Sequence, residues 1–210
     1  MKRGLFITLE GGEGAGKSTL ITNLAQRLAA TGQETVVTRE PGGTEGGEEI
    51  RQLLVTGSAD RWTPFSELCL FYAAREDHLE RLIRPALARG AVVLCDRFSD
   101  STRAYQGQEG GAGRNAVEAL DALIVKDTQP DLTLILDIDP AIGLSRAAQR
   151  RGTEDRFETK TLEFHTALRT GYLEIAKEFA ERCIVLDATL SPDALQDAAW
   201  IHIDNRLARS

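Results

Sequence analysis

The sequence predicts an α/β fold in which a parallel sheet is covered by helices on both faces. Short apolar runs rich in β-branched residues recur along the chain, and longer amphipathic stretches separate them. Alternation of strands and helices implies right-handed crossover connections, which make the strands parallel. No linker, internal repeat or low-complexity tract divides the 210 residues, so we expect one domain spanning residues 1–210.

Five strands are predicted from the apolar runs. They are Leu5–Glu10, Glu34–Thr38, Ala91–Cys95, Asp131–Asp137 and Cys183–Leu186. Ligands of parallel α/β sheets bind at the carboxyl ends of the strands. Polar residues that directly follow these runs are therefore candidates for a functional site.

Seven helices are predicted between and after the strands. They are Lys17–Ala30, Glu45–Thr56, Pro64–Ala88, Arg114–Lys126, Pro140–Arg151, Thr159–Glu181 and Pro192–Leu207. Thr31-Gly32 and Arg89-Gly90 are stop signals, because glycine accepts the left-handed backbone that ends many helices. Asp139 is a good N-cap before Pro140.

The segment between the first strand and the first helix fits the phosphate-binding pattern G-x-x-x-x-G-K-[ST]. Its residues are Gly11, Gly12, Glu13, Gly14, Ala15, Gly16, Lys17, Ser18 and Thr19. The glycines let backbone N–H groups turn inward around phosphate oxygens, and the helix N-terminus favours anions. Lys17 is expected to reach the β- and γ-phosphates of a bound nucleotide, and the Ser18 hydroxyl to ligate Mg²⁺. The alternative is a glycine-rich turn that binds nothing, but such a turn has no need of Lys-Ser.

Further candidates follow the next strands. Arg39, in the turn Thr38–Thr44, suggests a second anion site; the alternative is a solvated surface arginine. Asp96-Arg97 follows the third strand and offers an acid for the Mg²⁺ shell and a guanidinium for phosphate. An ion pair that caps the strand is the alternative. Asp137 is a second candidate for the acid, but we favour Asp96 because Asp137 leads into a helix start.

Two arginine-containing segments are less decisive. Phe71 and Arg75 share one helix face and together can stack on a base and donate to its carbonyl, although spacing alone favours a core aromatic. Four arginines, Arg146, Arg150, Arg151 and Arg156, surround the helix-breaking Gly152-Thr153. A closing flap would bring such arginines to a transferred phosphoryl group, whereas the alternative is a solvated charge run.

Composition limits the classes of function. The net charge of -7 and pI near 5.1 argue against non-specific binding to nucleic acid or to anionic membranes. No run is long enough to span a membrane or to form the apolar region of a signal peptide, so we expect a cytoplasmic protein. Cys69, Cys95 and Cys183 are far apart and are expected to be reduced core residues.

Taken together, these motifs resemble the thymidylate kinase family over essentially the whole chain. The resemblance rests on Leu9–Ser18, Thr38–Gly43, Phe71–Arg75, Asp96–Phe98 and Ala104–Gly107. It implies a three-layer P-loop nucleoside monophosphate kinase fold with a five-stranded parallel sheet of order 2-3-1-4-5. It also implies the bacterial type, with arginines in a lid at about residues 146–158, and a homodimer formed partly through Pro64–Ala88.

The resemblance further implies that ATP and dTMP are the substrates and Mg²⁺ the cofactor. The residues expected to bind dTMP are Phe71 and Arg75 at thymine, Thr102 and Gln106 at its polar edge, Tyr105 and Glu13 at the sugar, and Arg39, Arg97 and Arg51 at the phosphate. Catalysis is expected from Lys17, Arg97, Arg151 and Arg156. Adjacent Arg150 and Arg151 leave open which of the two enters the site. Ser18 and Asp96 are expected at the metal.

Three rival functions remain for a chain with these motifs. A kinase for dUMP, dCMP or AMP would use the same loop and flap. A GTP-dependent switch is expected to carry Asn-Lys-x-Asp, but no Asn-Lys dipeptide occurs. A non-catalytic ATP-binding assembly module would need neither flap arginines nor a second phosphate site.

Overall fold

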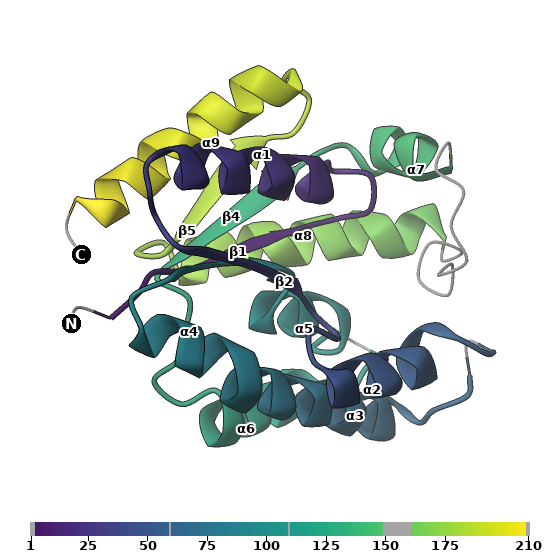
Figure 1. The fold of residues 1–210 in the computed structure, drawn as a ribbon. Helices are drawn as coiled ribbons and strands as arrows, with labels where there is room; N and C mark the ends of the chain where they lie inside the picture. The colour runs from purple at the N-terminus through teal and green to yellow at the C-terminus, as the bar shows by residue number, and fades with distance from the viewer. Residues whose placement is uncertain (1–2, 59, 109, 149–160, 209–210) are drawn as a thin grey trace.

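Five parallel strands form one sheet at the centre of the computed structural model (Figure 1). The structure describes residues 3–58, 60–108, 110–148 and 161–208. The strand order β2-β3-β1-β4-β5 confirms the predicted order. The strands are β1 (Phe6–Gly11), β2 (Thr35–Arg39), β3 (Val92–Asp96), β4 (Leu132–Asp137) and β5 (Cys183–Asp187).

The register of the strands brings predicted site residues to one edge of the sheet. Asp96, the last residue of β3, lies opposite Arg39 of β2 on one side and Leu9 of β1 on the other. The phosphate-binding loop leaves β1 two residues later. The carboxyl ends of β1, β2 and β3 therefore converge where a parallel sheet is expected to bind its ligand.

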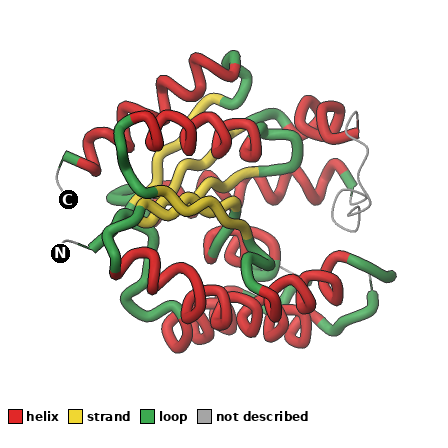
Figure 2. The backbone as a smooth tube through the Cα atoms, viewed as in Figure 1, coloured by secondary structure: helices red, strands yellow, loops and turns green. Residues whose placement is uncertain are grey.

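Helices cover both faces of the sheet (Figures 1 and 2). On one face lie α1 (Lys17–Ala30) and α9 (Pro192–Leu207). The other face carries α3 (Pro64–His78), the π-helical η1 (Leu79–Ile83), α4 (Arg84–Ala88), α5 (Ser99–Tyr105), α6 (Arg114–Ile124) and α8 (Leu162–Glu178). Helix α2 (Glu45–Val55) packs on α3, and α7 (Pro140–Ala148) follows β4. Among the described helices, none is long and apolar enough to cross a bilayer.

The period of two along β1 divides the core between the two faces. Ile7 and Leu9 pack with the α1 and α9 side, whereas Phe6 packs with the α3 to α6 side. Both sets are fully buried, which explains why the strand appears in the sequence as a continuous apolar run. Phe6 also meets the ring of Phe98 edge to face, with ring centroids 4.9 Å apart, and this contact anchors the chain directly after β3.

Two features differ from the predicted elements. The long helix predicted over Pro64–Ala88 is one helical run interrupted by the π-helical turn Leu79–Ile83. Helix α5 was not predicted at all. Its residues Ser99–Ala104 are buried, yet five of these six are polar, so the segment shows no apolar period of 3.6 residues.

Buried ion pairs hold α5 in place. Asp100 accepts hydrogen bonds from Arg182 at 2.6 and 2.9 Å and from Arg103 at 3.1 Å, and Arg103 also pairs with Asp121 at 2.8 Å. The Asp100 and Arg103 side chains are only 2% and 3% exposed. Charges this deeply buried require partners, so the network replaces the apolar contacts that α5 lacks.

Replacing Asp100 with Asn is expected to destabilise the fold by about 3 kcal/mol, because Arg182 is left buried with no carboxylate. Urea denaturation at pH 7 measures this loss. The matched control is Asp197→Asn, which breaks an exposed pair with Arg27 at 2.6 Å and is expected to cost less than about 1 kcal/mol. Equal small losses in the two variants would contradict a supporting role for the Asp100 network.

Candidate active site

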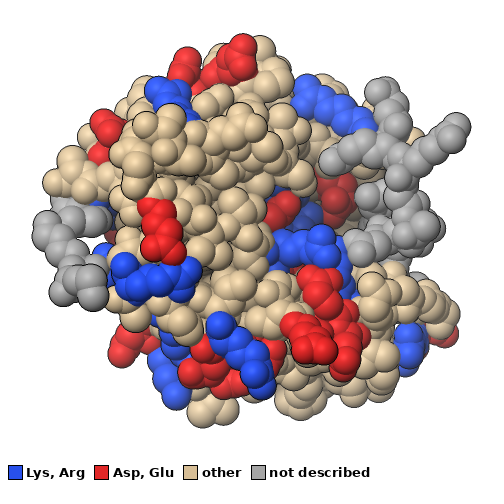
Figure 3. Space-filling view, in the orientation of Figure 1, with Lys and Arg blue, Asp and Glu red and all other residues tan. Residues whose placement is uncertain are grey.

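A single cleft at the carboxyl edge of the sheet joins most of the residues predicted for the site. Those that line it are Glu13, Gly14, Ala15, Gly16, Lys17, Ser18, Arg39, Arg51, Phe71, Arg75, Asp96, Arg97, Thr102, Tyr105 and Gln106. Gly11 and Gly12 line a smaller hollow behind the loop, and Thr19 lines neither. Figure 3 shows basic and acidic side chains gathered where the surface is hollowed between the upper helices and α2.

The phosphate-binding loop has the backbone that its glycines allow. Gly14 and Gly16 adopt left-handed φ values of 67° and 93°. A Cβ on Gly14 would lie 1.9 Å from the carbonyl oxygen of Gly143, so α7 packs directly against the loop there. Lys17 is buried, and its Nζ donates to the carbonyls of Gly11 and Gly12 at 3.0 and 2.9 Å. Its ammonium group thus lies inside the turn of the loop, at the N-terminus of α1.

Ser18 and Asp96 form an oxygen-only pair beside Lys17. The Ser18 hydroxyl donates to Asp96 Oδ2 at 3.3 Å. Asp96 Oδ1 is buried and accepts no hydrogen bond from any described residue. An orphaned carboxylate oxygen next to a hydroxyl suits a hard cation or a water in its shell, so these two residues fit Mg²⁺.

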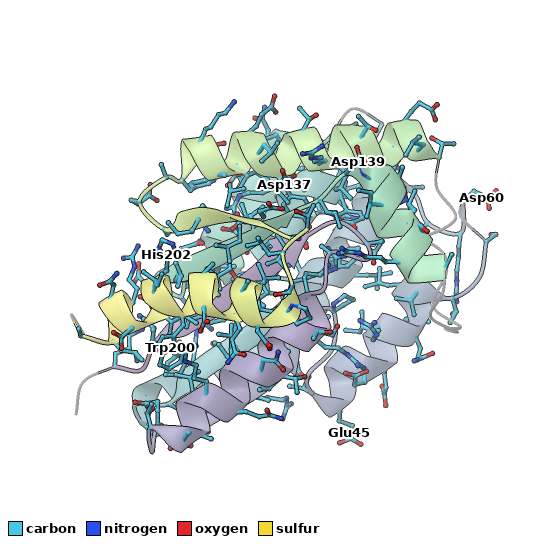
Figure 4. All side chains as sticks on the ribbon, turned by 90° about the horizontal axis from the view of Figure 1, so that it is seen from above. Glu45, Asp60, Asp137, Asp139, Trp200 and His202 are labelled. Atoms are coloured by element: carbon cyan, nitrogen blue, oxygen red, sulfur yellow. The ribbon has the colours of Figure 1, made fainter. Side chains whose placement is uncertain are left out.

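Asp137, the other candidate for this acid, has a different partner. It lies beneath α8, where Figure 4 labels it together with Asp139. Both Asp137 oxygens accept hydrogen bonds from Arg169, at 2.6 and 2.8 Å. Asp139 accepts from the backbone N–H of Ala141 at 2.9 Å and so acts at the start of α7 as predicted. The geometry therefore favours Asp96 over Asp137.

Arg97 connects the loop to the helices on the other face of the sheet. Its Nη1 donates to Gly11 O and to Tyr172 Oη, both at 3.0 Å, and its Nη2 donates to Glu13 Oε1 at 2.7 Å. Its backbone φ of 69° is left-handed, which is unusual for a residue with a side chain. The structure thus holds Arg97 in a strained conformation that directs its guanidinium into the cleft.

Glu13 is the acid of the loop. Burial alone would raise its pKa, but Arg97 and Lys17 lower the pKa of Glu13 to about 2. Tyr105 donates its hydroxyl to the same carboxylate at 3.1 Å. Glu13 is therefore ionised throughout the physiological range and offers a hydrogen-bond acceptor to whatever lies between the loop and Tyr105.

Arg39 and Arg51 lie at the outer side of the cleft. Arg39 pairs with Glu48 at 2.9 Å and is about half exposed, whereas Arg51 donates to the carbonyl of Pro41 at 2.8 Å. Both side chains thus flank the cleft from β2 and α2. An anion bound there would compete with Glu48 for Arg39. Because the Arg39–Glu48 pair is exposed to solvent, breaking it costs little free energy.

Arg75 also lines the cleft and is 2% exposed. Its Nε donates to Glu40 at 2.8 Å and its Nη2 to Thr102 at 2.9 Å. The guanidinium also lies 4.7 and 5.0 Å from the ring centroids of Tyr72 and Phe98. Its Nη1 is buried and has no hydrogen-bond partner in the described part of the chain. A buried cationic donor without an acceptor points to a ligand oxygen.

Buried side chains of β2 and α3 hold Glu40, the partner of Arg75. His78 Nδ1 lies 3.1 Å from Glu40 Oε1, and its Nε2 lies 2.7 Å from the hydroxyl of Thr38. All three side chains are buried. The chain of contacts ties β2 to α3 and fixes the carboxylate that orients Arg75.

Phe71 lines the cleft one turn before Arg75 and is only partly buried. It belongs to none of the described buried clusters, although spacing alone favoured a core position. Phe71 and Arg75 therefore present an aromatic ring and a guanidinium to the same space, with Thr102 and Gln106 of the α5 region across from them.

The predicted flap is only partly described. Arg151 and Arg156, with Arg150, lie outside the described residues. Arg146 is in α7 and donates to the carbonyl of Ala188 at 3.0 Å, so this arginine contacts the loop after β5.

Sequence reasoning missed a buried acid beneath the loop. Glu10 accepts from the backbone N–H of Phe98 at 2.8 Å and from the Ser101 hydroxyl at 2.6 Å. Tyr172 of α8 is 2.8 Å from Ser101 and also reaches Arg97. An acidic residue inside a predicted buried strand is the only sequence signal for this cluster; nothing marks Tyr172.

Comparison with known proteins agrees with this geometry. A family model described as "Thymidylate kinase" matches residues 9–199. A thymidylate kinase of Caulobacter vibrioides is 58% identical over 94% of this chain and 95% of its own, and one of Jannaschia sp. is 50% identical over 98% and 99%. The crystal structure of thymidylate kinase from Ehrlichia chaffeensis is similar, with a TM-score of 0.79 and 32% identity, over 96% of this chain and 99% of that one.

The buried Glu10 predicts a pH dependence of stability. Burial, with the charge of Asp100 acting in the same direction, raises the pKa of Glu10 from 4.5 to about 7. Because the folded state holds this proton more tightly, the contribution of Glu10 to stability falls as pH rises from about 4.5 to 7. Relative to wild type, Glu10→Gln should gain on the order of 2–3 kcal/mol between pH 4.5 and 8.

Urea denaturation of both proteins at several pH values measures this difference. The control is Glu174→Gln, which removes an exposed acid on α8 outside the Glu10 cluster. Parallel pH profiles for wild type and Glu10→Gln would show that Glu10 does not titrate in this range.

Proposed function

This chain belongs to the thymidylate kinase family, and from that membership and the geometry of its cleft we propose which residues bind and align the two nucleotides. The enzyme is a phosphotransferase of nucleotide biosynthesis that uses ATP to convert dTMP to dTDP, with ADP as the second product. The observation that carries the assignment of residues is the cleft itself. Its lining joins the phosphate-binding loop to a buried Arg75 whose Nη1 has no partner among the described residues.

The base of dTMP is proposed to lie between Phe71 and the α5 region. Phe71 stacks on thymine, and Arg75 donates its remaining N–H to the O4 carbonyl. Thr102 and Gln106 lie at the polar edge of the ring. Support comes from the burial of Arg75, since a carbonyl at that point completes the hydrogen bonding of a desolvated cation.

The sugar and phosphate of dTMP are proposed to extend toward the loop. Tyr105 packs beside the deoxyribose, where a 2′-hydroxyl would be crowded, and ionised Glu13 accepts from the 3′-hydroxyl. Arg39 and Arg97 hold the 5′-phosphate, with Arg51 as a weaker contact. The acceptor phosphate then faces the triphosphate of ATP, which is bound by the loop Gly11–Thr19.

Transfer in this arrangement is direct and needs no strong general base, because the attacking oxygen of dTMP is already an anionic phosphate oxygen. The chain contributes alignment and positive charge. Lys17 exchanges its bonds to the Gly11 and Gly12 carbonyls for phosphate oxygens, and Arg97 faces both phosphates. A lid at about residues 146–158 is proposed to add Arg151 and Arg156 and to exclude water, which competes as acceptor.

Mg²⁺ is proposed to bind beside Ser18 and Asp96, whose Oδ1 has no hydrogen-bond partner among the described residues and fits such a cation. The ion, when bound, neutralises charge on the phosphate oxygens of ATP and helps to orient them. Lys17 and Arg97 supply further positive charge to the same region.

The chain is also proposed to act as a homodimer in the cytoplasm. Exposed apolar side chains on two packed helices support the dimer: Phe65 of α3 is 57% exposed, and Leu123 of α6 is 67% exposed.

The three cysteines differ in burial. The free thiol of Cys69 is exposed on α3, which corrects its prediction as a core residue. The buried Cys95 and Cys183 are core residues as expected.

Turnover with separate acceptors tests the function. With MgATP, the enzyme should release ADP rapidly with dTMP and only weakly with dUMP, dCMP, AMP or GMP, measured in a coupled assay. Lys17→Ala is the control and should lower turnover with dTMP by at least about 100-fold while the folded protein persists. Preference for another monophosphate would overturn the roles of Phe71 and Arg75, and wild-type turnover in Lys17→Ala would overturn the mechanism.

Removing the Arg75 guanidinium should mainly weaken dTMP binding. We expect Arg75→Met, which keeps most of the side-chain volume, to raise the Kd for dTMP about 10- to 100-fold, since one charge-assisted hydrogen bond is lost. The Kd for ATP should change little, because Arg75 belongs to α3 and not to the phosphate-binding loop. Calorimetric titration with each nucleotide measures both effects; an unchanged dTMP affinity would make Arg75 a structural residue.

A further inference from the structure

The base end of the cleft presents two side chains of different hydrogen-bonding character. Arg75 can only donate, because a guanidinium has no acceptor. Gln106 is ambiguous by itself, since its amide has a donating NH₂ group at one end and an accepting carbonyl at the other. Which end of the Gln106 amide faces the cleft therefore decides which base edge fits beside Arg75.

A carboxylate removes that ambiguity. Gln106 is 6% exposed, and its Nε2 donates to Glu67 Oε1 at 3.1 Å. An ionised carboxylate accepts hydrogen bonds and cannot donate them, so the NH₂ end of the amide must face Glu67. The carbonyl Oε1 then points the other way, and within the described ranges it accepts no hydrogen bond from the protein.

The position of Glu67 suits this task. Glu67, Phe71 and Arg75 are four residues apart in turn, so they form one stripe on α3, and Phe71 and Arg75 of this stripe line the cleft. Glu67 also lies in the first turn of α3, where the helix dipole favours a negative charge. The helix thus supplies the stacking ring, the donor and the group that orients the acceptor.

Arg75 and Gln106 thus present a hydrogen-bond donor and, beside it, an acceptor to the base. This arrangement matches a base with a carbonyl next to a ring N–H, as O4 and N3–H are in thymine and uracil. Cytosine has an amino group and an unprotonated ring nitrogen at those positions. Its amino donor would face the Arg75 donor, and its ring-nitrogen acceptor would face the Gln106 carbonyl acceptor. Mismatched buried polar groups discriminate strongly, because each is left without a partner after losing water.

We propose that Glu67 is a specificity-determining positioning residue that fixes the Gln106 amide with its carbonyl toward the base and so excludes cytosine. This inference rests on the proposed binding of dTMP in the cleft. Glu67 touches no reacting atom; it acts through Gln106. Without the carboxylate, the amide can turn by 180° and donate to the ring nitrogen of cytosine, which relieves one of the two mismatches.

The test is Glu67→Gln, whose own amide can either accept or donate and so no longer fixes Gln106. We expect the ratio of kcat/KM for dTMP to that for dCMP to fall about tenfold, the effect of one hydrogen-bond mismatch. Equilibrium dialysis with labelled dTMP and dCMP measures the same ratio as Kd values, including affinities too weak to support turnover. The matched control is Glu76→Gln, an exposed acid on the same helix, which should leave the ratio unchanged.

A double-mutant cycle separates positioning from a general structural effect. If Glu67 acts only through Gln106, Glu67→Gln should not change the dTMP to dCMP ratio any further in a Gln106→Ala background. A ratio unchanged by the single variant, an equal loss for both nucleotides, or the same drop in both backgrounds would overturn the proposal. Failure of the wild-type enzyme to phosphorylate dTMP would instead overturn the proposed function, whatever the variants do.

Discussion

The left-handed backbone of Arg97 is the constraint on which the rest of the site depends. Such a conformation costs about 1–2 kcal/mol for a residue with a side chain, so its surroundings must enforce it. They do so from β1: the N–H of Arg97 donates to Leu9 O at 3.0 Å, and the next N–H, of Phe98, donates to the Glu10 carboxylate. The turn that results directs Arg97 across the sheet edge to the phosphate-binding loop, while Phe98 turns back into the core.

Fixed oxygen partners explain how an acidic protein concentrates positive charge in its cleft. Lys17, Arg75 and Arg97 would repel one another and lose hydration if they were buried alone. Each therefore has fixed oxygen partners: loop carbonyls for Lys17, Glu13 for Arg97, and Glu40 for Arg75. The net charge of -7 lies mostly elsewhere on the molecule, so the attraction for nucleotide phosphates is local rather than global.

Sequence predicted well those features that local patterns determine. The loop Gly11–Thr19 has a fixed spacing between strand and helix, and the strands are apolar runs, so both were located to within one residue. Helix α5 was not predicted from the sequence, because its folding depends on ion pairs among Asp100, Arg103 and Arg182, which are up to 82 residues apart in the chain. The roles of Glu40 as the partner of Arg75 and of Glu67 as the partner of Gln106 were not predicted, for the same reason. A carboxylate that orients a distant side chain has no local signature, and only the packing of β2, α3 and α5 reveals it.

The two ends of the cleft are built on different physical principles. At the loop, Lys17 and Arg97 already donate to backbone carbonyls, so a phosphate must exchange with acceptors of similar strength, and the net gain comes from its charge. At the proposed base site, Arg75 and Gln106 are buried and oriented by carboxylates, and the Arg75 Nη1 donor lacks a partner in the described residues. Pre-organised groups lose little entropy on binding and penalise a mismatched ligand strongly. In the proposed binding mode, discrimination between bases therefore resides in the folded protein itself, whereas Lys17 and Arg97 exchange carbonyl oxygens for phosphate oxygens.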